Sequence, residues 1–159
     1  MDCKINTLIH EYIYNDILSV ADAELPWEKM KNKTILLTGA AGFIGYYLTM
    51  AMLIRNDLYG DNIKVLALVR NGEKAKKRFG DALNRSDITL LVQDVCSEIK
   101  TEEKADYVIH AASQASAYFF ENDPVGTIDA NLTGTYKVLE YAKACGAVTL
   151  FVSSLKIYG

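Results

Sequence analysis

Three glycines at a spacing of three residues form the segment with the clearest chemical meaning. Gly39, Gly42 and Gly45 directly follow the apolar run 34–37 and open a helical pattern. Gly39 permits a tight turn, Gly42 lets the backbone approach a pyrophosphate, and Gly45 lets the helix pack closely on the strand. The helix N-terminus then offers free amides and a positive dipole end to phosphate oxygens. This strand, turn and helix therefore predict a dinucleotide-binding turn.

The same glycines have a second interpretation, in which they serve only the turn and the helix packing of a protein that binds nothing. The spacing alone does not separate these interpretations, but the position between a strand and a helix favours binding. The segment is not a P-loop, because no Gly-Lys-Ser/Thr follows to hold terminal phosphates and magnesium.

The rest of the chain alternates apolar runs with helical spacing. Apolar runs predict strands at 34–37, 63–69, 88–92, 107–111 and 148–152. Three- and four-residue spacing predicts helices over about 43–56, 73–83 and 125–144. Continuous apolar strands suit a parallel sheet covered on both faces. The expected fold is a Rossmann-like α/β domain, with a doubly wound parallel sheet of about five strands in the order 3-2-1-4-5.

An amphipathic helix precedes this domain. Its apolar stripe comprises Ile5, Leu8, Ile9, Tyr12, Ile13, Ile17 and Val20. Residues 1–32 are therefore expected to form a helical extension, and residues 33–159 the dinucleotide-binding domain. We expect the helix to cover an exposed face of the same domain, since this requires no partner. Packing on a second subunit, or on a further part of the protein, remains open.

Composition narrows the function classes. The 159 residues, 50% of them hydrophobic, suffice for one core, and the net charge of -3 argues against nucleic acid or an anionic membrane as a partner. No apolar run reaches the roughly 20 residues of a membrane span. The cysteines have no disulfide-framework or metal-ligand spacing, so we predict reduced thiols, no metal site and a cytoplasmic protein. They are Cys3, Cys96 and Cys145.

Further motifs follow the glycine turn in a fixed order. They are Asp94-Val95, His110-Ala111-Ala112-Ser113, the segment from Asn131 to Thr135, and the segment from Ser153 to Gly159. Together with the glycine turn they resemble the extended short-chain dehydrogenase/reductase family of nucleotide-sugar epimerases, dehydratases and decarboxylases, over residues 34–159. The resemblance implies that Asp94 contacts the adenine. It implies a cofactor site at Gly39, Ala41, Gly42, Phe43, Ile44, Gly45, Arg70, Asp94, Val95, His110, Ala111, Ala112, Ser113 and Asn131.

The end of the second predicted strand bears on the choice between NAD and NADP. Enzymes that use NAD usually carry Asp or Glu there to bind the ribose hydroxyls, whereas this strand ends in Arg70-Asn71. An arginine can accept a 2'-phosphate, and no carboxylate stands there to repel one. We predict a modest preference for NADP over NAD.

The resemblance also implies a catalytic serine and a Tyr-x-x-x-Lys pair, in which the lysine lowers the tyrosine pKa for proton transfer. Ser154, four residues before Tyr158, is the expected serine. Within the 159 residues, no tyrosine is followed by lysine four positions later. The sequence is therefore expected to stop short of the catalytic pair and of the domain that grips the sugar. His110 is expected to be a histidine packed near the crevice rather than a general base.

The leading hypothesis is the cofactor-binding part of a nucleotide-sugar epimerase, dehydratase or decarboxylase, which binds dinucleotide but does not turn over. Its partners would be the dinucleotide and, in the complete protein, a nucleotide sugar, with a second copy in a homodimer as a further option. The alternatives are a non-catalytic dinucleotide sensor or scaffold, and an NADP-dependent carbonyl reductase of the same family.

Overall fold

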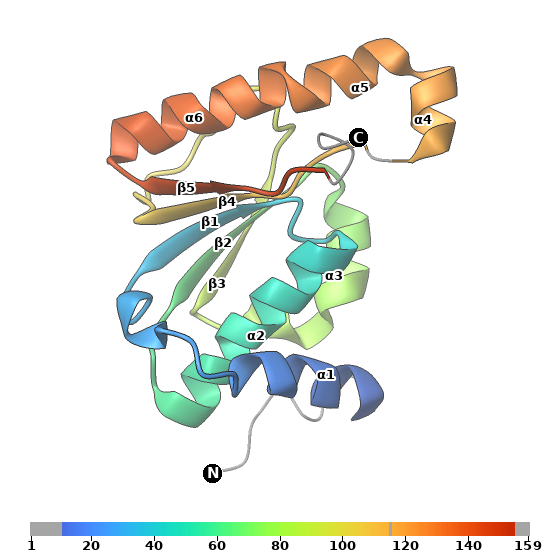
Figure 1. The fold of residues 1–159 in the computed structure, drawn as a ribbon. Coiled ribbons are helices and arrows are strands. Elements are labelled where there is room, and N and C mark those ends of the chain that lie inside the picture. The colour runs from blue at the N-terminus through green and yellow to red at the C-terminus, as the bar shows by residue number, and fades with distance from the viewer. Residues whose placement is uncertain (1–10, 115, 155–159) are drawn as a thin grey trace.

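A computed structural model describes residues 11–114 and 116–154, and its centre is one parallel sheet (Figure 1). The five strands lie in the order β3-β2-β1-β4-β5, which confirms the predicted order. All neighbouring strands run parallel. They are β1 (Thr34–Thr38), β2 (Lys64–Val69), β3 (Ile88–Val92), β4 (Tyr107–His110) and β5 (Val148–Phe151).

Helices cover both faces of the sheet (Figure 1). One side carries α1 (Glu11–Ala21), α2 (Phe43–Tyr59) and α3 (Gly72–Phe79). The other side carries α4 (Ala117–Asn122), α5 (Pro124–Asn131) and α6 (Thr133–Cys145). Short 3-10 turns occupy Trp27–Lys29 and Gly80–Asn84. This layering produces the expected doubly wound α/β fold.

The predicted helix over 125–144 is wrong in detail, because the structure has two helices that meet at Leu132. The Asp123 side chain caps α5 by accepting the N–H of Gly126. This capping hydrogen bond fixes the first residue of the helix. Near the break, the Thr135 hydroxyl donates to the carbonyl of Asn131, a local bond that bends helices. The predicted helix over 73–83 is also divided, since α3 ends at Phe79 and a 3-10 turn follows.

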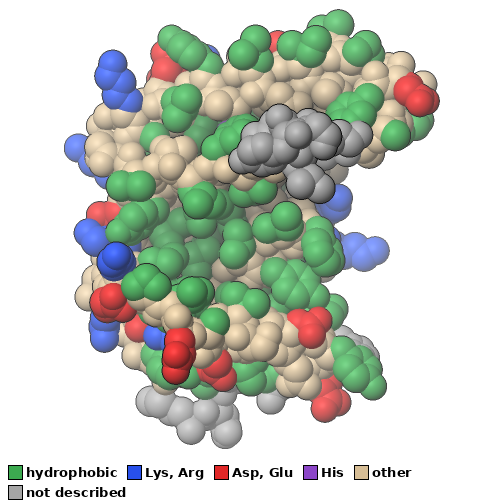
Figure 2. All heavy atoms as spheres, in the orientation of Figure 1, with side chains coloured by type: hydrophobic (Ala, Val, Ile, Leu, Met, Phe, Trp, Pro, Cys, Tyr) green, Lys and Arg blue, Asp and Glu red, His purple; other side chains and the backbone are tan. Residues whose placement is uncertain are grey.

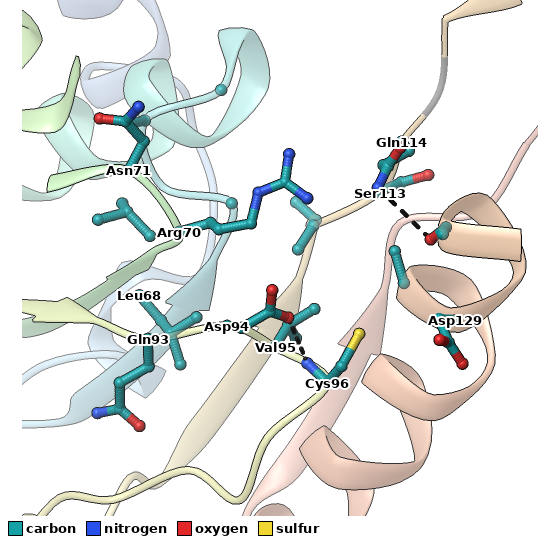
Figure 3. Close-up of a pocket in the computed structure, with 18 of the residues that line it drawn as sticks. Leu68, Arg70, Asn71, Gln93, Asp94, Val95, Cys96, Ser113, Gln114 and Asp129 are labelled. Carbon is teal, nitrogen blue, oxygen red and sulfur yellow. Dashed lines mark hydrogen bonds between the residues drawn. The ribbon is translucent and has the colours of Figure 1, made fainter. Parts of the chain in front are cut away.

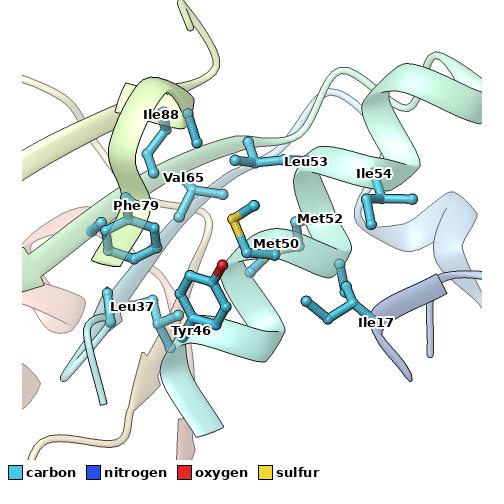
Figure 4. Close-up of a cluster of buried hydrophobic side chains, with 14 of the residues drawn as sticks. Ile17, Leu37, Tyr46, Met50, Met52, Leu53, Ile54, Val65, Phe79 and Ile88 are labelled. Carbon is cyan, nitrogen blue, oxygen red and sulfur yellow. The ribbon is translucent and has the colours of Figure 1, made fainter. Parts of the chain in front are cut away.

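Alternate residues of the central strand β1 belong to two separate hydrophobic clusters, one on each face of the sheet. Ile35 and Leu37 pack toward α2, α3 and α1 (Figure 4), while Leu36 packs toward α6. All these side chains are fully buried. The continuous apolar strand thus reflects a sheet buried on both faces, and its carboxyl end is held rigidly where the glycine turn begins.

The amphipathic stripe predicted for the N-terminal helix is only partly correct. Tyr14, Ile17 and Ala21 are buried on the α2 side, whereas Tyr12 and Val20 are exposed. Ile13 is also exposed, and Ile5, Leu8 and Ile9 lie outside the described residues. The helix does cover a face of the same domain, as expected, because Ile17 belongs to the cluster that surrounds α2 (Figure 4).

Arg55 on α2 fixes the end of this N-terminal helix. Its Nη1 donates to the carbonyl of Ala21 at 3.1 Å, and its Nε donates to Asp61 at 2.6 Å. The guanidinium lies 3.8 Å from the ring centre of Tyr59 and 4.9 Å from that of Trp27. A charged group with polar and aromatic partners thus joins α1 to the far end of α2.

Candidate functional site

A crevice of about 720 Å³ opens at the carboxyl ends of β1, β2, β3 and β4. It lies where the strand order reverses between β1 and β4, the position at which ligands bind in open α/β sheets. Of the predicted site residues, it brings together Gly39, Ala41, Gly42, Arg70, Asp94, Val95, Ala111, Ala112 and Ser113.

The glycine turn is pressed against the loop that follows β4. Gly39 has a φ of 69°, and a Cβ there would lie 2.7 Å from the carbonyl oxygen of Ala111 and 2.9 Å from the Cα of Ala112. At Gly45, a Cβ would collide with the carbonyl oxygen of Gly39 and lie 2.9 Å from the Cα of Ala40. Gly39 therefore supplies the tight turn, and Gly45 lets the first turn of α2 pack closely on that turn, whereas the predicted packing of this glycine on the strand itself stays a prediction.

The start of α2 offers backbone donors to the crevice. Gly42 is its N-cap residue, and no side chain caps this end. The Gly42 N–H donates to the carbonyl of Gly39 at 2.8 Å. The N–H groups of the following turn have no partner within the helix, so they can bind an anion. Phe43 and Ile44 have exposed side chains that do not line the crevice, which leaves only their backbone to serve a ligand.

The opposite wall carries an arginine and a carboxylate (Figure 3). The exposed Arg70 side chain extends from the end of β2 across the crevice, above Asp94. Asp94 Oδ1 accepts the N–H of Cys96 at 2.9 Å, which fixes the carboxylate. Burial, together with the neighbouring Asp94, raises the pKa of the Cys96 thiol. Cys96 is therefore a protonated wall residue and not a nucleophile.

His110 is buried beneath the crevice and does not line it. Burial lowers its pKa, so the ring is neutral at pH 7. This agrees with the predicted packed histidine, while a direct contact with a cofactor stays a prediction. Asn131 does not line the crevice either, but its side-chain oxygen accepts the hydroxyl of Ser113 at 2.8 Å. Both residues thus support the loop 111–113 from behind.

Ser154 is exposed, follows β5 and is not among the residues that line the crevice. Tyr158, the tyrosine of the same motif, lies outside the described residues. The structure therefore brings together the dinucleotide part of the predicted site and leaves the catalytic role of Ser154 a prediction.

Gln114 is the most informative wall residue that sequence reasoning missed. Its side-chain oxygen is buried and has no hydrogen-bond partner among the described residues, and the residue lines the crevice. A buried acceptor without a donor is costly, and the ribose hydroxyls of a dinucleotide are suitable donors. This acceptor, the glycine cradle and the uncapped helix end together fit a dinucleotide.

Other wall residues were also missed, for an identifiable reason. Gln114 directly follows the recognised motif at the end of β4, so its position was a usable signal. Gly126, Asp129 and Ala130 lie within the predicted helix over 125–144, but helical spacing alone does not show which face of a helix lines a crevice. The missed residues are Leu68, Val69, Asn71, Lys74, Gln93, Cys96, Gln114, Asp123, Gly126, Asp129 and Ala130.

Within residues 11–114 and 116–154, no group of three or more His, Cys, Asp or Glu side chains is placed to hold a metal ion. No helix in this part of the chain has the length and apolar character needed to cross a bilayer.

Solved structures with the same fold include sugar-nucleotide enzymes. A UDP-N-acetylglucosamine 4-epimerase from Methanobrevibacter ruminantium M1, in complex with UDP-N-acetylmuramic acid, superposes with a TM-score of 0.66 and 24% identity, over 82% of this chain and 40% of that one. A UDP-glucose-4-epimerase from Stenotrophomonas maltophila with bound NAD gives a TM-score of 0.63 and 20% identity, over 80% of this chain and 38% of that one. These likenesses establish the fold.

Sequence comparison identifies the family. UDP-glucuronic acid decarboxylase 4 of Arabidopsis thaliana is 32% identical over 131 residues, which cover 82% of this chain and 28% of the relative. UDP-glucuronic acid decarboxylase 1 of Danio rerio is 31% identical over 127 residues, which cover 80% of this chain and 28% of the relative. The chain thus spans less than a third of the length of these relatives. The sequence model of the NAD dependent epimerase/dehydratase family matches residues 35–159, and the chain belongs to this family.

Proposed function

We propose that this chain is the dinucleotide-binding part of an enzyme that modifies nucleotide sugars, of the epimerase, dehydratase or decarboxylase type. One observation carries the proposal: the glycine turn and the uncapped start of α2 face a crevice at the switch point of the sheet. A nicotinamide dinucleotide held there would supply hydride-transfer chemistry, with the hydride coming from the carbon that bears a sugar hydroxyl.

Different residues of the chain would bind different parts of the dinucleotide and of the sugar. The backbone at Gly42 and the first turn of α2 would hold the pyrophosphate, because the helix end supplies N–H donors and a positive field. Asp94 would hold the adenine, and the Gln114 side-chain oxygen would accept a ribose hydroxyl. Ser154 would bind the reacting oxygen of the sugar. The proton-transferring pair Tyr-x-x-x-Lys is not among these 159 residues, so we expect binding without turnover.

Calorimetric titration of the chain with NAD and with NADP tests this function. We expect saturable binding of at least one dinucleotide at one site, and no reduction of either when UDP-glucuronic acid or UDP-glucose is added. Failure of both dinucleotides to bind would refute the proposed site. Reduction of either dinucleotide on addition of sugar would refute the expected lack of turnover.

Arg70 is expected to confer a preference for NADP. Its guanidinium extends into the crevice (Figure 3), and β2 is followed by Arg70-Asn71 rather than by a carboxylate that would bind the ribose hydroxyls. A charge-assisted hydrogen bond contributes about 1.5–3 kcal/mol, so Arg70→Ala should weaken NADP binding by about tenfold or more. NAD affinity should change less than about threefold, since NAD lacks the 2'-phosphate.

Lys77→Ala is the matched control, because Lys77 is exposed on α3 and does not line the crevice. This variant should bind both dinucleotides as the unchanged chain does. Tighter binding of NAD than NADP, combined with no effect of Arg70→Ala, would contradict the preference.

An apolar stripe on α5 and α6 supports a homodimer. The stripe contains Val125, Ile128, Leu132, Tyr136 and Leu139, which are 71%, 61%, 70%, 60% and 49% exposed. Their spacing of three and four residues places them on one outer face, where Figure 2 shows hydrophobic side chains along the helices. A second copy related by a two-fold axis would set the same stripe against itself and cover it.

Leu132→Glu tests this dimer, since a charge in the middle of an apolar interface opposes association. We expect sedimentation equilibrium to show a dimer for the unchanged chain and a shift to monomer for the variant. Leu150→Glu, at the exposed edge strand β5, is the control. Dissociation by the β5 variant alone would place the association at the sheet edge and contradict the proposed face.

A further inference from the structure

His110 lies at the centre of a chain of hydrogen bonds beneath the crevice. The residue is 2% exposed and is surrounded by three other elements of the fold. Its Nδ1 lies 2.6 Å from the hydroxyl of Thr38 on β1, and its Nε2 lies 3.1 Å from the hydroxyl of Thr135 on α6. The Phe151 ring on β5 packs beside it at 5.5 Å between ring centres. Both ring nitrogens therefore have partners.

The donors and acceptors around the ring require one protonation state. The Thr38 hydroxyl oxygen accepts the N–H groups of Ala111 and Ala112, each at 3.2 Å, and the Ala111 N–H also reaches the backbone carbonyl of Thr38 at 3.3 Å. A hydroxyl has two lone pairs and one proton, so with both lone pairs engaged Thr38 donates its proton to Nδ1 of His110. The Thr135 hydroxyl donates to the carbonyl of Asn131 at 2.6 Å, and so it accepts from Nε2. The imidazole is neutral, with its proton on Nε2.

We propose that His110, as a neutral imidazole protonated on Nε2, is a positioning residue for the dinucleotide crevice. By fixing the Thr38 hydroxyl, it fixes the amides of Ala111 and Ala112, which line the crevice. The carbonyl oxygen of Ala111 also lies 2.7 Å from the position of a Cβ at Gly39. The loop after β4 is therefore packed directly against the glycine turn. This inference rests on the proposed dinucleotide function of the crevice.

Protonation of His110 would break this arrangement. An imidazolium donates from both nitrogens, so the Thr38 hydroxyl oxygen would have to accept the Nδ1 proton. Because both lone pairs of this oxygen are already engaged, it would release one of the two backbone N–H groups. Among the described residues, the groups that face the ring are Thr38 from β1, Phe151 from β5 and Thr135 from α6, and none of these is charged. Burial accordingly lowers the pKa of His110.

The direction in which stability changes with pH follows from this lowered pKa. The unfolded chain takes up the histidine proton near pH 6.5, before the folded chain does. Between that pH and the lower folded pKa the unfolded state binds more protons, so stability falls as the pH is lowered. Dinucleotide affinity should fall over the same range, because one of the two loop amides is then released from the Thr38 hydroxyl.

Nitrogen-15 NMR of the chain without ligand tests the protonation state. The sequence has two histidines, His10 and His110, so a His10→Gln variant assigns the signals. We expect His110 to show the Nε2–H tautomer at pH 7 and to titrate below pH 6.5. An Nδ1–H tautomer, or an imidazolium at pH 7, would overturn the proposal.

A matched pair of variants tests the positioning role. Thr135→Val removes the acceptor at Nε2, whereas Thr135→Ser keeps it. We expect hydrogen exchange at the Ala112 amide to be at least about fivefold faster in Thr135→Val, with NAD or NADP bound at least about fivefold more weakly, and little change in Thr135→Ser. Equal exchange at this amide in the two variants would overturn the role of His110.

The pH profile of binding separates positioning from a merely structural contribution. Affinity of the unchanged chain should decline as the pH falls through the pKa of His110, and the decline should be absent in His110→Gln. A decline of equal size in both proteins would overturn the proposal. Failure of the proposed dinucleotide function would give a different result. The chain would then bind no dinucleotide at any pH, while the NMR and hydrogen-exchange results would still be as expected.

Discussion

Gly39→Ala is expected to abolish most dinucleotide binding and to destabilise the fold. The left-handed conformation at φ 69° costs a residue with a Cβ about 1–2 kcal/mol. The new Cβ would also lie 2.7 Å from the Ala111 carbonyl oxygen, which is backbone and cannot rotate away. Pushing the turn off this loop adds about 1–3 kcal/mol, as overpacking does elsewhere. Because the displaced turn carries the helix end that would hold the pyrophosphate, we expect affinity to fall at least about fiftyfold.

Gly146→Ala is the matched control for this variant. Gly146 has the same φ of 69°, but a Cβ there would meet nothing within 4 Å. It ends α6 and does not line the crevice. Chemical denaturation should show a loss of only about 1–2 kcal/mol for this control, and titration should show unchanged dinucleotide affinity. Equal losses of affinity in the two variants would contradict the close contact between the turn and the loop after β4.

Arg85→Met is expected to cause the largest loss of stability away from the crevice. Arg85 lies between two carboxylates, 2.9 Å from Asp57 and 2.6 Å from Asp87, and the three side chains are only 12% to 18% exposed. Removing the arginine leaves two largely buried carboxylates without their cation. Breaking a fully buried pair costs about 3–5 kcal/mol, so we expect about 2–4 kcal/mol here, because some solvent reaches these groups.

The pH dependence of this variant gives a second readout. Burial alone would raise the pKa of Asp87, but hydrogen bonds from Arg85 and Asn56 hold it below its usual value. A carboxyl whose pKa is lowered by folding adds stability above about pH 4, and this stability is lost as the pH falls through the folded pKa. Urea denaturation between pH 7 and pH 3 should therefore show a smaller acid-induced loss in Arg85→Met than in the unchanged chain.

Lys76→Ala provides the control, since Lys76 and Glu73 form an ion pair on the surface of α3 with side chains 64% and 87% exposed. Water screens such a pair, so its removal should change stability by less than about 0.5 kcal/mol. If Arg85→Met cost no more than this control, the buried charge cluster would not be a source of stability.

The sheet was predictable because its signals are local and strong. Leu36 and Leu66 sit in continuous apolar runs that only a sheet covered on both faces explains, and Gly39 marks the turn at its carboxyl edge. The strand order followed from the doubly wound fold as a whole rather than from any strand by itself. The wall formed by Arg70 and Asp94 was also foreseen, because strand ends in a parallel sheet meet at one edge.

Other features depend on contacts that a linear pattern does not contain. The stripe proposed for the N-terminal helix treats Tyr12 and Val20 as core, but Arg55 fixes the helix in a rotation that buries Tyr14 and Ala21 instead. The break at Leu132 was missed because apolar spacing continues across it and the deciding hydrogen bonds involve side chains. The position of His110 beneath the crevice, rather than on its wall, likewise depends on which face of β4 it occupies.

The residues that fix α1 to α2 have a thermodynamic consequence for binding at the other end of α2. This helix has 17 residues, so Arg55 lies about 18 Å along it from its first residue at the crevice, and α1 packs against it. A helix held near its far end and packed against α1 has little rotational or sliding freedom left. Ordering of the phosphate-binding end is therefore completed when the chain folds, and a dinucleotide that binds there loses less entropy than it would at a mobile helix end.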